Sequence, residues 1–488
     1  MRAAVAAVGT VLSVLSGAAA AEQSTNSARG LLSNIQACQD ITRKVSNAST
    51  VFYPGAISYF DDVYHQSASS SEVATCSVEP GTAEDVGVIL RAIGENLTPF
   101  AVKGGGHVMN AGFSSTTGIQ IAMSRFKEVS YDAARGTVSL GAGLTCDEVH
   151  AALDPLNATF VGARATGVGI AGLILGGGFS FLSNQHGLAA DNVVEFELVL
   201  TNGTIKSVTA ADTDLFWALK GGGNNFGVVT QFVVKAYPYT QIWGGLMTVV
   251  GQREKVVQAI LNFTSAVTDP KAAILPSFID LAGVPTVGLI LFYDGPLPPP
   301  GIFDEFLALT SITNSIKTGT WSDLMATTEL SPTKNLRGAY HTLTVKDNDR
   351  KFLDAILAES ANVSLSLLPI TGTFTGYHIE PFVAGYLLNP NRTSDSAFPY
   401  NRDIGMPVNV FYSWILPTSD QLMLKALKAS VKRLDAVAGT QLPRYPNYAL
   451  GDTPLVDIFG ADGVERLQRT ASVVDAMKTM GRTGGFKF

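Results

Sequence analysis

Two separate glycine clusters constrain this chain more than any other feature of its sequence. The first follows a short apolar run at Phe100–Val102 and reads Lys-Gly-Gly-Gly-His over residues 103–107. The second spans residues 167–178 and ends in three consecutive glycines. Successive glycines leave backbone N–H groups with no side chain over them, so each cluster offers a cradle for an anion such as a pyrophosphate. We expect the two clusters to form two halves of one binding site, with His107 at its edge.

The second cluster also contains Gly167-x-Gly169-x-x-Gly172, the spacing of a dinucleotide-binding fingerprint, and Asp191 follows at about the right distance. A Rossmann site requires a helix that begins at this loop and continues for several turns. Glycines at 176–178 would stand in the second turn of that helix, at a cost of roughly 1 kcal/mol each relative to alanine. The sequence therefore favours an irregular, glycine-lined wall, and a nicotinamide-dependent dehydrogenase is the alternative.

The segments around the clusters predict helices that alternate with strands. We expect residues 21–66 to be irregular, a helix over Glu84–Glu95, and a second helix that begins at the capping box Thr145–Glu148. Asn202-Gly203 is a strong hairpin signal between two β-rich runs. Further expected elements are strands at 119–122, 137–143, 158–161 and 226–236 and a short helix at 212–220.

From about Tyr239 onward, strands alternate with longer amphipathic helices, which indicates a second α+β layer that covers a substrate. The expected strands include 246–250, 286–293 and 408–416, and one helix should end at Gly439 as its C-cap. The proline-rich stretch 295–301 is expected to be a surface loop. We expect Tyr377, His378, Tyr412 and Trp414 to be buried sheet residues, and pocket lining is the alternative.

Composition excludes several functional classes. A length of 488 residues predicts two or three domains, and 46% hydrophobic with 15% charged residues is ordinary for a globular protein. The net charge of −7 argues against a nucleic-acid partner, whose backbone requires clustered cations. No two histidines have the helical spacing of a metal pair, so we expect no metal site. We also find no Gly-x-Ser-x-Gly elbow and, beyond the N-terminus, no apolar run long enough for stable membrane insertion.

The N-terminal residues and the cysteines predict a secreted protein. Residues 1–20 resemble a signal peptide, with one arginine, an apolar stretch and small residues near its end. Seven glycosylation sequons fit a secreted glycoprotein, at Asn47, Asn96, Asn157, Asn202, Asn262, Asn362 and Asn391. Of the three cysteines, we expect Cys38 and Cys76 to form a disulfide and Cys146 to be a buried free thiol.

Five ordered motifs, taken together, resemble the berberine-bridge-enzyme-like branch of the vanillyl-alcohol-oxidase flavoprotein family. They are the first glycine cluster at 103–107, VGIAGLILGGGFSF, GLAADNVVEFELVLTNG, DLFWALKGGGNNFGVVTQF and Tyr445-Pro-Asn-Tyr448. The resemblance implies a two-domain α+β fold of the PCMH type that binds FAD. After a lead-in over 21–69, it places an FAD-binding domain at 70–237, a substrate domain at 238–441 and a returning C-terminal segment at 442–488.

The resemblance also implies which residues bind FAD. His107 matches the family's histidine that bonds covalently to the flavin ring. A second, cysteinyl link found in many members is not expected, because the corresponding position is Ala165. The other residues assigned to the cofactor are Lys103, Gly104, Gly105, Gly106, Gly112, Thr166, Gly167, Gly169, Gly172, Gly176, Gly177, Asn192, Gly227, Val228 and Asn447.

Flavin oxidation of an alcohol or phenol needs a base for the O–H proton. His186, Tyr448 and Tyr445 are the candidates. His186 stands where the family often carries a tyrosine that faces the flavin, and a histidine titrates near neutrality; alternatively, it only caps the turn before Gly187. The two tyrosines need a nearby positive charge to lower their pKa, or else they are core residues.

The resulting expectation is a secreted FAD-dependent oxidase. It would transfer a hydride from a small organic substrate, such as an alcohol, amine or secondary metabolite, to the flavin and then pass the electrons to oxygen. Oxidative ring closure is possible, and an aromatic or polyketide-like substrate is favoured over a large sugar. We expect a monomer. The alternatives are the nicotinamide-dependent dehydrogenase and a non-catalytic secreted glycoprotein with the same fold.

Overall fold

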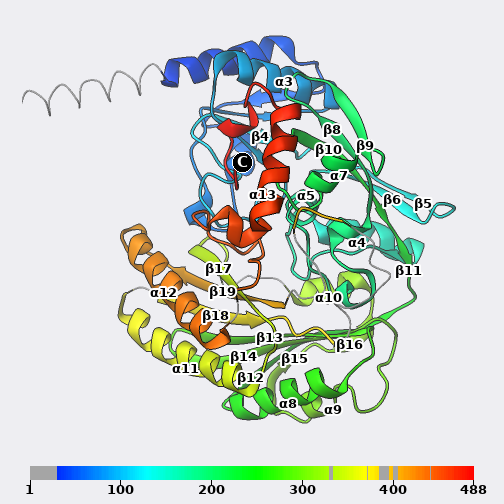
Figure 1. Ribbon diagram of the computed structural model, residues 1–488, viewed down its shortest axis with the longest axis vertical. Helices are drawn as coiled ribbons and strands as arrows, with labels where there is room; N and C mark the ends of the chain where they lie inside the picture. The colour runs from blue at the N-terminus through cyan, green and yellow to red at the C-terminus, as the bar shows by residue number, and fades with distance from the viewer. Residues whose placement is uncertain (1–29, 329–332, 371, 384–394, 399–404, 440) are drawn as a thin grey trace, which may run out of the picture.

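The computed structural model describes residues 30–488 except 329–332, 371, 384–394, 399–404 and 440. The expected signal peptide and the sequon at Asn391 lie outside the described residues. The described chain forms two layered parts, each with its own hydrophobic core, which lie one above the other in Figure 1. No described helix is both long and apolar enough to cross a membrane.

The N-terminal stretch is more ordered than its polar sequence predicts. A helix covers residues 30–44, followed by β1 (Thr50–Phe52) and α2 (Ile57–Val63), so the expectation of an irregular segment was wrong. Ala37, Cys38 and Ile41 are fully buried on one face of the first helix. This helix has a narrow apolar face. The face is too short to stand out as a periodic pattern in the sequence, but it is long enough to pack against the first domain.

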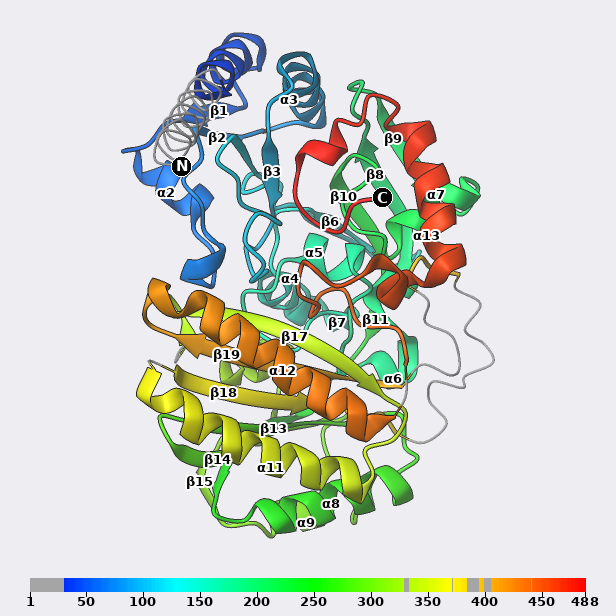
Figure 2. The same cartoon turned by 60° about the vertical axis from the view of Figure 1, so that its left-hand side comes forward.

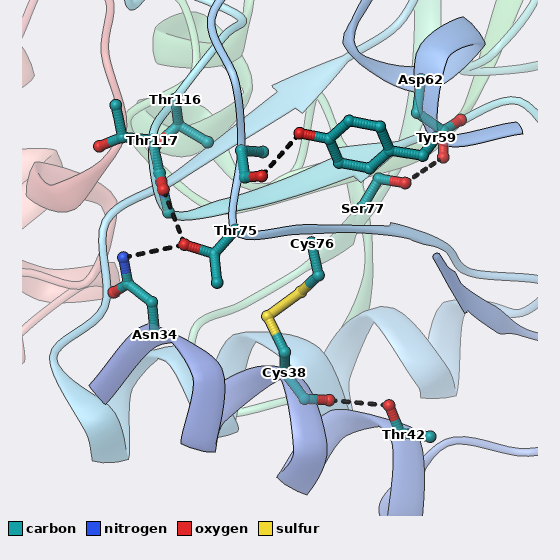
Figure 3. Close-up of a disulfide and its surroundings, with 12 residues drawn as sticks. Asn34, Cys38, Thr42, Tyr59, Asp62, Thr75, Cys76, Ser77, Thr116 and Thr117 are labelled. Atoms are coloured by element: carbon teal, nitrogen blue, oxygen red, sulfur yellow. Dashed lines mark hydrogen bonds between the residues drawn. A yellow bond between two sulfur atoms is a disulfide. The ribbon is translucent and has the colours of Figure 1, made fainter. Parts of the chain in front are cut away.

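A disulfide attaches this helix to the first sheet. It joins Cys38 to Cys76, the first residue of β2 (Cys76–Glu79), as predicted (Figure 3). Cys146 is a buried free thiol, also as predicted. Tyr59 of α2 adds a buried hydrogen bond from its hydroxyl to the Ala74 carbonyl, at 2.6 Å, and so holds the same edge.

The upper part contains two sheets of four or more strands and one two-stranded sheet. The first has the order β1-β2-β4-β3, in which β3 (Phe100–Lys103) and β4 (Ile119–Ala122) run parallel to each other. The helix α3 (Ala83–Asn96) leads into β3 through Leu97 and matches the predicted helix within a residue. The first glycine cluster therefore follows the carboxyl end of a buried strand, where α/β proteins place ligands.

The second sheet is antiparallel, with the order β5-β6-β10-β8-β9. Its strands are β5 (Val129–Asp132), β6 (Thr137–Gly141), β8 (Val193–Val199), β9 (Ile205–Thr209) and β10 (Val228–Lys235). The hairpin predicted at Asn202-Gly203 joins β8 to β9. The helix α4 (Cys146–Leu153) begins at the predicted capping box, where Glu148 accepts the Thr145 backbone N–H at 2.8 Å. The expected strand at 158–161 shrinks to β7 (Ala158–Thr159), which pairs with β11 (Tyr237–Pro238).

The lower part is an eight-stranded antiparallel sheet in the order β15-β12-β14-β13-β18-β19-β17, with β16 paired to β12. The strands are β12 (Ile242–Val250), β13 (Ala272–Leu281), β14 (Val284–Tyr293), β15 (Ser311–Asn314), β16 (Lys317–Gly319), β17 (Arg337–Val345), β18 (Gly372–Ile379) and β19 (Met406–Trp414). One face carries α11 (Arg350–Leu367) and α12 (Asp420–Ala438), which lie side by side in Figure 2. The helix α12 ends at Gly439 in a left-handed conformation, as predicted.

After α12 the chain returns to the upper part. The helix α13 (Leu455–Val474) packs against α7 (Thr213–Leu219), and Figure 1 shows it in red beside the upper sheets. The described chain thus has the α+β class that the sequence predicts. Its two layers leave the second face of the eight-stranded sheet turned toward the glycine clusters.

Candidate active site

A cavity of about 540 Å³ lies between the upper part and the free face of the lower sheet. Both glycine clusters line it, together with residues from β13, β14, β18 and β19. The cavity therefore brings together segments that are far apart in the sequence.

The two glycine clusters meet backbone to backbone. A Cβ atom added to Gly105 would lie only 2.5 Å from the Gly169 nitrogen and 2.9 Å from the Gly167 carbonyl oxygen. Neither Gly105 nor Gly169 tolerates a side chain, because the nearest neighbours are backbone atoms that cannot rotate away. The two loops thus converge as the sequence predicts, and their exposed amides form one continuous wall of the cavity.

Most residues assigned to the cofactor line the cavity. These are Gly104, Gly105, Gly106, His107, Gly169, Gly172, Gly176, Gly227, Val228 and Asn447. Ala165, where no second flavin link is expected from the sequence, also lines it.

Six assigned residues lie outside the cavity lining. Lys103 points away from it, because its Nζ donates to the Asp61 carbonyl at 2.7 Å, so it does not supply charge to a phosphate. The Thr166 hydroxyl donates to the Met325 carbonyl. The remaining four serve the loop structure: Gly167 donates to Asp147, Gly112 to Ser115, Gly177 to the Ile174 carbonyl, and Asn192 to the carbonyls of His186 and Leu188.

The second cluster does not build a Rossmann helix. The helix that begins there, α5 (Ile170–Leu175), has only six residues and ends at Gly176. Gly177 and Gly178 then take positive φ angles of 105° and 87°, which leave the helical region. Asp191 accepts the Leu188 N–H instead of a ribose. The geometry needed by the nicotinamide alternative is absent from this loop, as the glycine run predicts.

His107 is the one side chain of the first cluster with nucleophilic chemistry. It lines the cavity, and its Nε2 is buried with no hydrogen-bond partner among the described residues. Burial lowers the pKa of His107 to about 4, so the imidazole is neutral at ordinary pH. A neutral ring has a nitrogen lone pair that is free to form a bond.

The Tyr-Pro-Asn-Tyr motif packs directly on the second glycine cluster. The Tyr445 hydroxyl accepts the Gly178 N–H at 3.1 Å and an N–H of Asn447 at 3.0 Å. Asn447 also donates to the Leu173 carbonyl, and its amide occupies the space that a side chain on Gly176 would fill. Tyr445 and Asn447 therefore fix the C-terminal segment against the cavity wall.

Tyr448 belongs to a buried charged triad with Arg164 and Glu380. Its hydroxyl accepts from Arg164 Nη2 and donates to Glu380 Oε1, both at 2.9 Å. Arg164 also pairs with Glu380 at 2.7 Å, and their side chains are 9% and 1% exposed. All three residues line the cavity, and Glu380 Oε2 is buried without a hydrogen-bond partner among the described residues. This arrangement presents a charged, hydrogen-bonded cluster to the cavity.

The electrostatics of the triad keep the tyrosine protonated. Burial raises the Tyr448 pKa well above its usual value, and the Glu380 charge adds to the rise, whereas Arg164 opposes it. Burial alone would lower the Arg164 pKa, but the Glu380 carboxylate, with a smaller contribution from Tyr448, outweighs this and the net direction is upward. Arg164 thus stays charged and compensates the Glu380 carboxylate. Burial also raises the Tyr445 pKa to about 12.

His186 does not lie on the cavity. It ends the short helix α6 (Ser183–His186) and stacks on Tyr237, with ring centroids 3.6 Å apart and planes 11° apart. Burial lowers its pKa to about 4, not near neutrality as the sequence suggests. The geometry supports the alternative of a residue that holds the turn before Gly187.

The four aromatic residues singled out in the lower sheet lie on its two opposite faces. Tyr377, Tyr412 and Trp414 belong to the core under the helices, where the Tyr377 and Tyr412 hydroxyls lie 2.7 Å apart. His378 points to the opposite face and lines the cavity, because neighbours along a strand alternate between faces. Of the four aromatic sheet residues singled out in the sequence, only His378 lines the pocket.

The C-terminal tail closes another side of the cavity. Gly485 and Phe486 line it, and the Phe486 ring lies edge-on to Phe113 with centroids 5.2 Å apart. The Phe486 carbonyl accepts from Asn225 at 2.8 Å, and Lys487 Nζ donates to the Asn224 carbonyl at 3.1 Å. The tail is therefore part of the site and not an appendage.

Sequence reasoning missed Arg164 and Glu380. Arg164 stands beside Ala165, three residues before the second glycine cluster, and a single cation next to a glycine loop was a usable signal. Glu380 follows an alternating strand, and nothing in its neighbourhood marks it. The two are 216 residues apart, so only the fold pairs them. Within the described part of the chain, no cluster of three His, Cys, Asp or Glu side chains has the arrangement of a metal site.

Comparisons with known proteins agree with this geometry. The family described as FAD binding domain matches residues 74–209. FAD-dependent monooxygenase drtC of Aspergillus calidoustus is 31% identical, over 94% of this chain and 91% of its own length. FAD-dependent monooxygenase FUP4 of Fusarium proliferatum is 30% identical, over 82% of each chain.

Solved structures share the fold at low sequence identity. 6-Hydroxy-D-nicotine oxidase from Arthrobacter nicotinovorans gives a TM-score of 0.76 at 20% identity and covers 90% of this chain and 97% of its own. Berberine bridge enzyme, solved as a variant with (S)-reticuline, gives 0.75 at 18% identity and covers 92% and 97%. Both superpose over the upper and the lower part.

Proposed function

Because the chain belongs to the berberine-bridge-enzyme-like family of FAD-linked oxidoreductases, we propose that it is an oxidase of a small, largely apolar alcohol or phenol. It is an enzyme, and FAD is its cofactor. The proposal concerns the finer points: how FAD is attached, which residues move the proton, and where the electrons go.

The residues present fit FAD. The wall that Gly105 and Gly169 form has no side chain over its backbone, which suits a diphosphate, and a Cβ at either position would strike the facing loop and separate the two halves of the wall. The buried, unpartnered Nε2 of His107 supports a covalent bond to the flavin ring. A second link is not proposed, because Ala165 lines the cavity where a cysteine would be needed and Cys146 is buried in α4. When bound, FAD accepts a hydride from a substrate carbon and passes two electrons to oxygen, which gives hydrogen peroxide.

The triad supplies the proton acceptor. A substrate hydroxyl that donates to the Tyr448 oxygen can lose its proton while Tyr448 passes its own to Glu380 Oε1, 2.9 Å away. The raised pKa of Tyr448 is no obstacle in this relay, because no free tyrosinate has to form. Arg164 holds the tyrosine and the carboxylate in line and offsets the carboxylate charge before the proton arrives. Tyr445 positions the motif, since its hydroxyl is already engaged by Gly178 and Asn447.

The setting of the enzyme completes the proposal. We propose that the functional unit is a monomer. The Cys38–Cys76 disulfide supports folding in an oxidising compartment, and the exposed asparagines of the sequons at 47, 157, 202 and 362 support glycosylation in the secretory pathway.

One observation carries the function: the orphaned His107 ring, the glycine wall and the Arg164–Glu380–Tyr448 triad open onto the same cavity. The test begins with acid precipitation of the purified protein. Yellow colour in the pellet and a His107 peptide carrying the mass of one FAD are expected. Colour released into the supernatant would contradict covalent attachment, and His107→Ala serves as the control that should release it.

A substrate screen then separates oxidase from monooxygenase chemistry, which matters because the similar curated relatives are named monooxygenases. One hydrogen peroxide per substrate oxidised is the expected result. If isotopically labelled oxygen instead appears in the product, the oxidase proposal is wrong.

A further inference from the structure

The floor of the cavity is a mostly apolar sheet face. Six side chains from five strands make it so: Leu246, Leu275, Ile279, Ile290, Phe374 and Phe411. Such a floor favours a flat, hydrophobic substrate, because contact with it removes apolar surface from water.

Three polar side chains interrupt this floor in a straight row. Ser277 of β13 pairs in register with His378 of β18, and His378 pairs with Asn409 of β19. Residues that lie directly opposite across neighbouring strands share one face of a sheet. All three line the cavity, and we refer to Ser277, His378 and Asn409 as the polar row.

The polar row contains one hydrogen bond between its own side chains and one acceptor without a partner among the described residues. His378 Nδ1 lies 2.7 Å from the Ser277 hydroxyl oxygen, which fixes the ring. Asn409 is 7% exposed, and its Oδ1 is buried with no hydrogen-bond partner among the described residues. A buried acceptor without a donor costs about 1–3 kcal/mol, so it is conspicuous in an apolar surface.

The chemistry of the row selects a hydroxyl. Burial, with a smaller contribution from Arg164, lowers the pKa of His378 to about 4, so its ring is neutral. With the Ser277 hydroxyl donating to Nδ1, the ring proton lies on Nε2 and is available as a donor. Asn409 Oδ1 needs a donor, and a hydroxyl is the group that donates and accepts at once.

The row also lies at a useful distance from the proposed proton relay. Glu380 is two residues beyond His378 along the chain, and both line the cavity, so they are separated by roughly 7 Å, two residues of a strand. That separation matches a substrate with one hydroxyl at the relay and a second across an aromatic ring.

We propose that the polar row anchors a second hydroxyl of the substrate, which makes the substrate class a flat, largely apolar compound with two hydroxyl groups on opposite sides. This inference rests on the oxidase function proposed above. The row positions the substrate, and the proton relay remains with the triad.

The test measures binding of two matched probes to the holoenzyme by calorimetry without oxygen. Tyrosol carries a phenol and a second hydroxyl, and para-propylphenol replaces that hydroxyl by a methyl group. Asn409→Leu should lower the ratio of tyrosol affinity to para-propylphenol affinity about three- to tenfold, which corresponds to one hydrogen bond, without weakening the binding of para-propylphenol. If Asn409 had a purely structural role, its replacement would weaken the binding of both probes together.

Two further variants keep the test decisive. Ser277→Ala removes one oxygen atom from the row at little risk to folding and should reduce the preference for tyrosol in the same direction. Gly481→Ala lies outside the cavity lining, its added Cβ meets nothing within 4 Å, and it should leave the ratio unchanged. An unchanged ratio in both Asn409→Leu and Ser277→Ala overturns the inference. If the protein carries flavin and forms peroxide in that case, the oxidase function stands, whereas a protein that does neither loses both proposals.

Discussion

Gly105 and Gly169, 64 residues apart in the chain, lie so close that their backbones leave no room for a side chain on either. A Cβ on Gly105 would be 2.5 Å from the Gly169 nitrogen. The contact seals the two loops into one wall, and the bridge between Thr145 and Gly169 holds the second loop from behind. The site thus depends on the close approach of two backbones. Once either glycine carries a side chain, a substitution elsewhere cannot restore that approach.

Gly105→Ala should therefore abolish flavin loading. The added methyl group pushes the two loops apart and disturbs the amides that would hold the diphosphate. The ratio of flavin to protein absorbance of the purified variant measures this. Gly481→Ala is the matched control, because a Cβ there meets nothing within 4 Å, and it should load normally. Full loading of Gly105→Ala would show that the cofactor does not lie against this wall.

Tyr448→Phe should lower kcat/KM about 10²- to 10⁴-fold, the usual contribution of a general base, while flavin loading stays intact. Glu380→Gln should have an effect of similar size, because both variants interrupt one relay, and the double variant should lose little more. The rate of flavin reduction after rapid mixing with substrate, followed by stopped-flow absorbance, provides the measurement.

His186→Phe is the informative comparison for the relay. Phenylalanine preserves the stack on Tyr237, and His186 lies outside the cavity lining, so turnover should match that of the wild type. A fall comparable to that of Tyr448→Phe would restore His186 as the base.

Buried histidines should make the protein acid-sensitive. His150 is fully buried and stacks on Trp321, neither ring nitrogen has a partner among the described residues, and burial lowers its pKa to about 4. The unfolded value is about 6.5, so between these values the unfolded state binds more protons and stability falls as pH falls. By this linkage His150 alone removes about 2 kcal/mol between pH 8 and pH 5.

His150→Phe should therefore gain stability relative to the wild type as the pH is lowered, by about the same 2 kcal/mol at pH 5. Urea unfolding at several pH values measures the difference. At pH 8 only the packing change remains, which makes the high-pH value the internal control. A difference that does not change with pH would show that His150 is protonated in the folded protein.

Removing the disulfide should destabilise the N-terminal part. The Cys38–Cys76 bond closes a loop with a sequence separation of 38, for which chain entropy predicts about 3–4 kcal/mol. A Cys38→Ser/Cys76→Ser variant should melt at a lower temperature, and reducing agent should lower the melting temperature of the wild type but not of the variant. Equal sensitivity of both proteins to reductant would point to another bond.

The sequence predicted the elements that depend on local chemistry. The capping box at Thr145, the hairpin at Asn202-Gly203 and the C-cap at Gly439 were placed correctly because short-range hydrogen bonds and glycine conformations decide them. The convergence of the two glycine clusters on one cavity was also predicted, since runs of glycine are visible in the sequence.

The parts that failed depend on tertiary contacts. The direction of Lys103 is set by the Asp61 carbonyl, which no local pattern reveals. His186 was misjudged because its stacking partner, Tyr237, comes from a strand 51 residues later. Glu380 joined the site only through its pairing with Arg164 across the two parts. Ten of the sixteen residues that local motifs assigned to the cofactor thus line the cavity, but the motifs did not predict the Arg164–Glu380 pair.

The placement of Gly485 and Phe486 in the cavity wall has a consequence for biosynthesis. A nascent chain cannot enclose the nucleotide until these residues, which follow both parts of the fold in the sequence, have left the ribosome and folded back beside Phe113. Closure of this wall therefore comes late in folding, and chains arrested before residue 485 would emerge without a closed site.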